Sequence, residues 1–208
     1  RKDGQVRVIS LPERALVTEF EGPTDWSAGA ISSSAKRLAI ATERGTVELR
    51  DAGDGHLIHT LPGHGRPYLA LLFTLDEASL IGGDDERLLD AWNVSSGVLE
   101  TTRAVHSRLI SALATSADGA LLAAASADGS IAILTTERLK LLSSIQTREP
   151  VESIAFESPR TLAALLPKAR TSWNIEGLTR LPPIGSTTSM VLEISADDRG
   201  ETVSWSSL

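Results

Sequence analysis

The sequence predicts an all-β protein built from four-stranded antiparallel units, and two observations carry this prediction. First, one pattern is written twice in succession between Gly63 and Glu149, with equivalent residues 42 positions apart, as His64 and His106 are. Second, each copy contains short apolar or alternating stretches that are separated by turns rich in Gly, Asp and Ser. A repeat of about 40–45 residues with four strands per copy is the signature of a β-propeller blade.

Composition limits the functional classes. The chain has 208 residues, of which 41% are hydrophobic and 23% charged, as in a soluble globular protein. Its net charge of −7 argues against a nucleic-acid partner, because phosphate contacts need clustered Lys and Arg. The absence of cysteine excludes disulfides and thiol nucleophiles. The apolar runs are too short to cross a bilayer, and no signal peptide is visible. We therefore expect no membrane association and a cytoplasmic location. Because Met190 is the only methionine, we expect a piece excised from a longer chain.

The units are expected in order along a single propeller domain or propeller fragment, residues 1–208. Their approximate bounds are 1–22 (half a unit), 23–63, 64–105, 106–149, 150–187 and 188–208 (half a unit). The first half-unit supplies a hairpin of Gln5–Ser10 and Ala15–Glu21, in the place of third and fourth strands.

The complete units each supply at least three recognisable strands. In the unit 23–63 they are Ala28–Ser32, Leu38–Thr42, Thr46–Arg50 and His56–Leu61, and in the unit 64–105 they are Tyr68–Phe73, Ser79–Gly83 and Leu88–Trp92. In the unit 106–149 they are Leu109–Ala114, Leu121–Ser126 and Ile131–Leu134, and in the unit 150–187 they are Val151–Phe156, Thr161–Leu166, 172–174 and Leu178–Pro182.

The last half-unit repeats the front of a unit, with strands at Val191–Ile194 and 201–206 around a turn at 195–200, so that Trp205 falls in a second strand. The chain thus begins and ends at the same phase of the repeat. One blade completed by both termini would remove an exposed sheet edge. The alternative is a piece of a larger, seven-bladed propeller cut at two equivalent points. Either reading gives about five repeat-equivalents.

The pattern resembles the WD repeat, which carries Gly-His near its start, Asp in a tight turn and Trp-Asp at the end of the third strand. The matches are Gly63-His64, Asp84 or Asp85 and Trp92-Asn93 in one unit, and His106, Ser126 and Asp128 in the next, with partial matches at Trp173-Asn174 and Arg50-Asp51. The small-residue strands resemble bacterial members of the family. The resemblance implies a propeller that serves as the sensor or partner-binding part of a larger protein.

The recurring polar residues have a structural and a catalytic reading. We expect a repeated network of His64, Asp85, Trp92, His106, Ser126, Asp128 and Trp173 that ties the blade edges together. His106, Ser126 and Asp128 also suit a Ser-His-Asp hydrolase. The structural reading is favoured, because the positions recur with the repeat and no Gly-x-Ser-x-Gly elbow is present.

No metal or cofactor is expected. The acidic turn Asp84-Asp85-Glu86 lacks the alternating carboxylates and central Gly of a calcium loop. His56 and His59 are three apart on an expected strand, so they should point to opposite faces.

The predicted partner face lies where the loops between successive blades meet the loops between second and third strands. The resemblance places both loop classes around one mouth of the central channel. The residues expected to bind there are Trp26, Arg66, Tyr68, Arg108, Arg87 and Arg170. Arg, Tyr and Trp are common anchors of protein interfaces.

The predicted function is a non-catalytic platform for a protein or peptide partner. One alternative is an enzyme or small-ligand binder that uses the central channel, which would need convergent acids, histidines or a cofactor. Another is a purely structural blade set that packs against other domains of the same chain, which an exposed apolar rim would favour.

Overall fold

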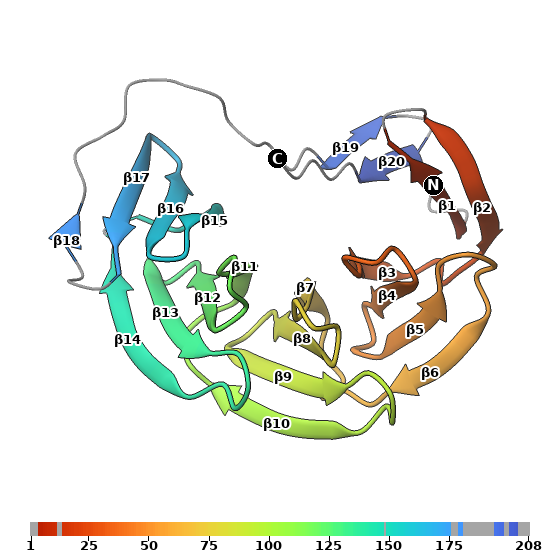
Figure 1. Ribbon diagram of the computed structural model, residues 1–208, viewed down its shortest axis with the longest axis horizontal. Coiled ribbons are helices and arrows are strands. Elements are labelled where there is room, and N and C mark those ends of the chain that lie inside the picture. Colours follow the sequence, from red (N-terminus) through yellow and green to blue (C-terminus); the bar gives the residue numbers. More distant parts are fainter. Residues whose placement is uncertain are drawn as a thin grey trace.

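The computed structural model describes residues 4–11, 14–147, 149–175, 179–180, 194–197 and 200–203. These residues form only strands, turns and loops, and the sheets follow one another in chain order around an arc (Figure 1). The all-β, multi-bladed prediction is confirmed. None of the described segments is a helix long and apolar enough to cross a membrane.

Four sheets contain four strands each, and each is an antiparallel meander in sequence order. The first contains β3 (Trp26–Ile31), β4 (Arg37–Thr42), β5 (Val47–Asp51) and β6 (Leu57–Leu61), and the second contains β7 (Tyr68–Phe73), β8 (Ser79–Asp84), β9 (Leu88–Asn93) and β10 (Leu99–Ala104). The third contains β11 (Ile110–Thr115), β12 (Leu121–Ser126), β13 (Ser130–Thr135) and β14 (Leu141–Gln146), and the fourth contains β15 (Ser153–Ser158), β16 (Thr161–Leu166), β17 (Ala169–Asn174) and β18 (Thr179–Arg180). We call these sheets blades 1 to 4.

Two hairpins stand at the ends of the described chain. They are formed by β1 (Gln5–Ser10) with β2 (Ala15–Glu21), and by β19 (Ile194–Asp197) with β20 (Gly200–Val203). Figure 1 draws both in the same part of the ring, but they are separate two-stranded sheets, and no ladder joins them among the described residues. A blade shared by both termini therefore stays a prediction.

The expected strands agree with the observed ones to within about two residues in most cases. The last half-unit is different, because β19 runs over Ile194–Asp197, where a turn at 195–200 was expected. The small residues of that stretch read as a turn, yet Ser195 pairs with Thr202 in the hairpin. Trp205 lies outside the described residues.

The blades pack face to face, and the alternation of each strand serves two neighbouring cores. In β12, Ala123 and Ala125 enter the core against blade 4, whereas Leu122 and Ala124 enter the core against blade 2. All four are fully buried, and their small size lets neighbouring sheets approach closely. Burying a side chain such as Leu122 contributes about 2 kcal/mol.

A bulge near the start of the first strand modifies this alternation in blades 1 to 3. The register shifts between Trp26 and Ala28, between Tyr68 and Ala70, and after Ile110. A bulge puts two residues opposite one and so changes which side chain faces the core. Tyr68 and Ile110 are thereby buried, at 1% and 0% exposure.

Candidate functional site

The candidate site is the end of the blades where second and third strands are joined and where one blade leads to the next. In an antiparallel meander these two classes of loop lie at the same strand ends. All six residues of the predicted partner face lie in these loops or at the strand ends beside them. We call this end the partner face.

Blade 2 holds a polar network around Asp90, which is fully buried on β9. Its Oδ2 accepts a hydrogen bond from the Tyr68 hydroxyl at 2.5 Å. Its Oδ1 accepts from the Thr102 hydroxyl at 2.5 Å and lies 3.1 Å from His64 Nε2. Sequence reasoning missed Asp90, because it expected the partner of His64 in the turn at Asp84 or Asp85. The signal that could have found it is the carboxylate itself, since a buried Asp within an apolar strand needs donors.

The placement of Tyr68 corrects one sequence prediction. Its ring is buried edge-on against Trp92, with centroids 5.2 Å apart, and its hydroxyl is used by Asp90. Burial and the Asp90 carboxylate hold the pKa of Tyr68 well above its usual value. Tyr68 is therefore a core residue and is not available to a partner. Trp26 fills the equivalent bulged position of blade 1 and is half-buried.

The turn at residues 84–86 is also structural. Asp84 is buried, and its Oδ1 accepts the backbone N–H groups of Glu86, Arg87 and Leu88. Asp85, expected in the network of His64, instead faces Arg66, whose guanidinium lies 4.0 Å from Asp85 and 2.8 Å from Glu86. The acidic residues of this turn thus hold the backbone and a neighbouring arginine.

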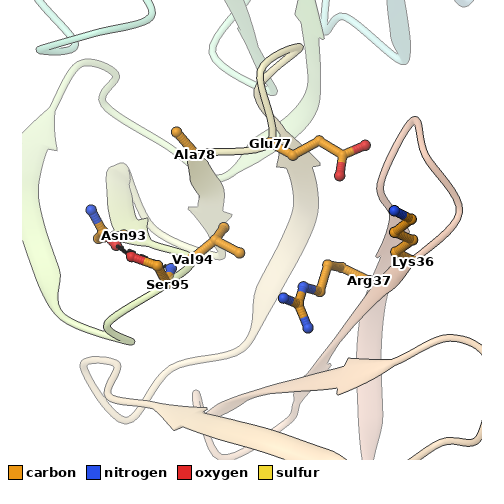
Figure 2. A pocket seen from close by; sticks show the side chains of 7 residues that line it. All are labelled: Lys36, Arg37, Glu77, Ala78, Asn93, Val94 and Ser95. Carbon is orange, nitrogen blue, oxygen red and sulfur yellow. Dashed lines mark hydrogen bonds between the residues drawn. The ribbon is translucent and has the colours of Figure 1, made fainter.

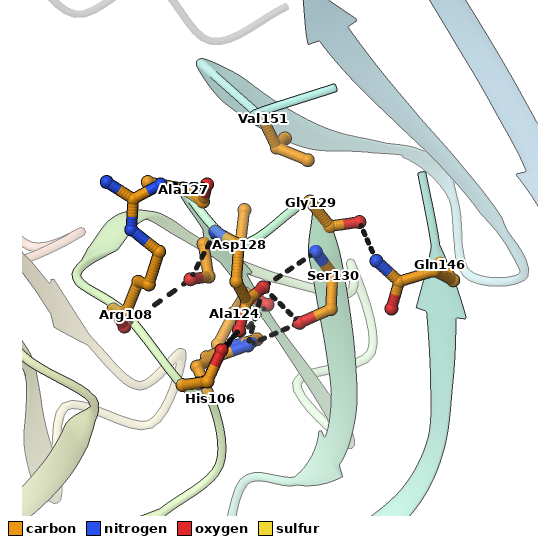
Figure 3. Close-up of polar contacts among 12 residues, drawn as sticks. His106, Arg108, Ala124, Ala127, Asp128, Gly129, Ser130, Gln146 and Val151 are labelled. Atoms are coloured by element: carbon orange, nitrogen blue, oxygen red, sulfur yellow. Dashed lines mark hydrogen bonds and ion pairs between the residues drawn. The ribbon is translucent and has the colours of Figure 1, made fainter. Parts of the chain in front are cut away.

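Blade 3 holds the second network, centred on His106 (Figure 3). The His106 side chain is fully buried, with Nε2 3.0 Å from the Ala124 carbonyl and Nδ1 2.8 Å from Ser130 Oγ. Asp128 Oδ1 lies 3.9 Å from Nδ1 and accepts from the Ser130 hydroxyl and N–H. The hydroxyl beside His106 is thus that of Ser130 and not that of Ser126. His106 and Asp128 of the expected network thus lie close together, while Ser126 is replaced beside His106 by Ser130, which sequence reasoning missed.

Asp128 also joins the β12–β13 turn to the loop between blades 2 and 3. Its Oδ2 accepts the Ser107 N–H at 2.8 Å and the Ser107 hydroxyl at 3.0 Å. Burial alone would raise the pKa of Asp128, but the hydrogen bonds from Ser130 and Ser107 outweigh it and lower that pKa well below its usual value. Asp128 is therefore held as a carboxylate.

The same geometry argues against a hydrolytic triad. Ser126 Oγ caps the Asp128 N–H at 3.1 Å and lies 3.4 Å from the Arg108 carbonyl, so its described contacts are with backbone. Burial lowers the pKa of His106, and its Nε2 lies against the Ala124 carbonyl. Each group is thus fully engaged in holding the blade edge, and Ser126 is not paired with a base.

Two arginines of the partner face form few or no side-chain hydrogen bonds or ion pairs with the described residues. Arg87 is exposed, and its side chain makes no hydrogen bond or ion pair with any residue that the structure describes. Arg108 is exposed and reaches only the Ala127 carbonyl, at 3.5 Å (Figure 3). Arg170, by contrast, pairs with Glu157 across the fourth blade.

One group of potential metal ligands occurs among the described residues, in the β5–β6 turn. Its members are Asp51, Asp54 and His56. Asp51 caps the Gly53 N–H, while Asp54 bonds the backbone and the ring of His56, so these contacts account for the turn itself. His59 lies apart, 3.1 Å from the Ser95 carbonyl.

Comparison with known proteins agrees with this architecture. Residues 87–159 match the family of the anaphase-promoting complex subunit 4 WD40 domain. Two solved structures, of U3-55K and of the RRP9 WD40 repeats, superpose on 76% of this chain with a TM-score of 0.70 and 17% sequence identity. The fold is that of a WD40 propeller. At this level of identity the likeness concerns the fold alone.

One curated relative also matches part of the chain. The U3 small nucleolar RNA-associated protein 15 homolog of Xenopus tropicalis is 28% identical over 127 residues, which is 61% of this chain and 25% of that protein. The chain therefore spans a quarter of that relative and about half of the two solved structures. The expected bacterial character finds no support here, since this relative comes from a frog.

Proposed function

We propose that this chain is a non-catalytic WD40 propeller that binds a protein partner on its partner face, with Arg87 and Arg108 as the principal contacts. The observation that carries the proposal is the contrast among the arginines of this face. Arg66 and Arg170 are each paired with a carboxylate of their own blade, while Arg87 and Arg108 are not. Arg is enriched in interface cores, where its planar group binds carboxylates in pairs of hydrogen bonds.

The non-catalytic part of the proposal is supported by the two networks. The titratable groups that could act as acid, base or nucleophile are Asp90, His106, Asp128 and Ser126, and all four hold backbone or neighbouring side chains. A catalytic set needs a nucleophile within reach of a base. In the His106 network the hydroxyl within reach of the ring is that of Ser130, but this hydroxyl donates to the Asp128 carboxylate and the His106 side chain is fully buried.

A ribonucleoprotein setting is a second candidate, because the name of the Xenopus relative associates that protein with an RNA. The sequence argues that this chain would join such a particle through protein contacts. Its net charge of −7 opposes direct binding to phosphates. A gel-shift titration with a structured RNA separates the two, since direct RNA binding that weakens steeply with salt would contradict the protein-only reading.

The test is a paired affinity capture with the wild-type chain and Arg87→Ala/Arg108→Ala as baits. A matched control, Arg138→Ala/Lys140→Ala, removes the same charge from exposed positions of the β13–β14 turn, at the end of the blade opposite the partner face. Captured proteins are identified, and the purified partner is then titrated against each variant. We expect the first variant alone to lose the partner, while thermal midpoints stay within about 2 °C of each other. Equal capture by all three baits would refute the assignment of this face.

A further inference from the structure

A polar hollow lies between blades 1 and 2, at the strand ends opposite the partner face. At this end the first strand of each blade is joined to the second, and the third to the fourth. The volume of the hollow is about 330 Å³. Figure 2 shows Lys36 and Arg37 of blade 1 on one side, Asn93 and Ser95 of blade 2 on the other, and Val94 between the two sides. We call this hollow the inter-blade groove.

The cationic side of the groove has no anionic partner. Lys36 is exposed and Arg37 is half-buried, and neither side chain makes a hydrogen bond or ion pair with the described residues. The Arg37 guanidinium projects into the groove in Figure 2. A half-buried charge without a partner is unfavourable, because it loses hydration without compensation.

The polar groups around these cations are already engaged. Glu77 accepts hydrogen bonds from the Ser33 hydroxyl at 2.7 Å and from the Ser34 hydroxyl at 2.8 Å, which joins the two blades. The side-chain Oδ1 of Asn93 accepts from the hydroxyl and N–H of Ser95. The groove is thus left with two free cations and no free acceptor of matching strength.

The repeat shows that the fold does not require these cations. In each four-stranded blade the backbone carbonyl before the second strand accepts an N–H from beyond the third strand, at residues 36, 78, 120 and 160. The fold therefore uses the backbone carbonyl at this position and does not depend on the side chain. Blade 2 has Ala78-Ser79 where blade 1 has Lys36-Arg37, blade 3 has Ala120-Leu121, and blade 4 has Arg160-Thr161. Adjacent cations occur at this position only in blade 1 among the four described blades.

We propose that the inter-blade groove binds an acidic peptide segment of a protein. One carboxylate bonds the Arg37 guanidinium, which suits planar two-point contact, and Lys36 supplies a second positive charge. A neighbouring small apolar side chain packs on Ala78 and Val94. Because the groove offers two cations beside the Glu77 carboxylate, it suits one carboxylate at a time better than a strand of closely spaced phosphates. This site is independent of the partner face, so either can fail without the other.

The probe is a fluorescein-labelled peptide of alternating alanine and glutamate, followed by fluorescence anisotropy at low ionic strength. The same peptide with glutamine in place of glutamate is the uncharged control. We expect saturable binding of the glutamate peptide to the wild-type chain. Lys36→Ala/Arg37→Ala should weaken it about tenfold, since it removes two charge-assisted contacts.

The matched control variant is Arg138→Ala/Lys140→Ala, which removes the same charge from the equivalent end of blade 3. Its affinity should stay within about twofold of the wild type. Equal weakening by both variants would overturn the proposal, because net charge alone would then explain binding. Equal binding of the glutamine peptide, or no saturation by about 1 mM peptide, would overturn it as well. Tighter binding of a short RNA, lost in the Lys36/Arg37 variant, would replace the peptide by a phosphate ligand.

Discussion

Replacing Asp90 by alanine should destabilise the propeller more than any other single change in the blade 2 network. Asp90 is fully buried and is the common acceptor of Tyr68, Thr102 and His64. Removing it leaves three donors without their acceptor. The cost depends on which of the three can reach water.

The magnitude follows from the burial of each donor. The Tyr68 hydroxyl is buried, so the loss of its bond to a carboxylate costs about 2 kcal/mol. His64 is 39% exposed and Thr102 is exposed, so each can bond water, and each loss costs about 0.5 kcal/mol. The expected total for Asp90→Ala is about 3 kcal/mol. Asp90→Asn keeps the shape and one acceptor, and the Tyr68 hydroxyl can turn to fit, so about 1 kcal/mol is expected.

The assay is urea unfolding of the wild type, both Asp90 variants, Tyr68→Phe and the double variant Asp90→Ala/Tyr68→Phe. The cycle isolates the coupling between the two residues, which should be about 1.5 kcal/mol. Unchanged m-values would show that all variants lose the same structure. A cost of Asp90→Ala below about 1 kcal/mol, or a coupling near zero, would refute the reasoning from buried donors.

Three further predictions use other parts of the structure. Gly63→Ala should cost about 3 kcal/mol or more in urea unfolding, because its Cβ would lie 1.8 Å from the Gly45 carbonyl oxygen. Gly29→Ala is the contrast, because its Cβ would make only an ordinary contact of 3.6 Å with the Ala39 carbonyl oxygen. Burial lowers the pKa of His106 below 6.5, so the unfolded chain binds more protons than the folded chain, and the free energy of unfolding should fall as pH drops below about 6.5. His106→Gln should make the free energy of unfolding less dependent on pH in this range. An unchanged pH dependence would contradict the role given to His106. Hydrogen bonds from Ser33 and Ser34 lower the pKa of Glu77 to about 2, so its stabilising contribution is present above about pH 4.5 and is lost as pH falls towards 2. Glu77→Gln should therefore reduce the drop in thermal midpoint between about pH 4.5 and pH 2.

The arrangement of strands could be predicted from the sequence because the repeat constrains it twice. Spacing gives the place of each strand in a blade, and alternation gives the side that faces a core. The positions 92 and 173 could thus be assigned to third strands, and both tryptophans are buried there. The last half-unit was harder, because its short polar stretch carries little alternation.

The candidate site was less predictable, because the spacing of the repeat does not show where a strand bulges or which side chains form ion pairs. Tyr68 follows a loop and seemed exposed by position, but the bulge beside it turns the ring inward. Arg66 and Arg108 are equivalent in the repeat, yet only Arg66 meets carboxylates, because the turn of blade 2 is acidic at 85 and 86. Equivalent positions therefore share a backbone and not a set of partners.

This separation of backbone from side chain also gives a rule for finding function in a repeat protein. A residue that recurs with the repeat and is satisfied within its blade, as His106 is, serves the fold. A residue that departs from the repeat and is left unsatisfied has no such explanation. Arg37 meets both conditions in the inter-blade groove, while Lys36 beside it, and Arg87 and Arg108 on the partner face, meet the second. The two sites lie at opposite ends of the blades, so one propeller can hold two segments of a partner at once without their competing for the same surface.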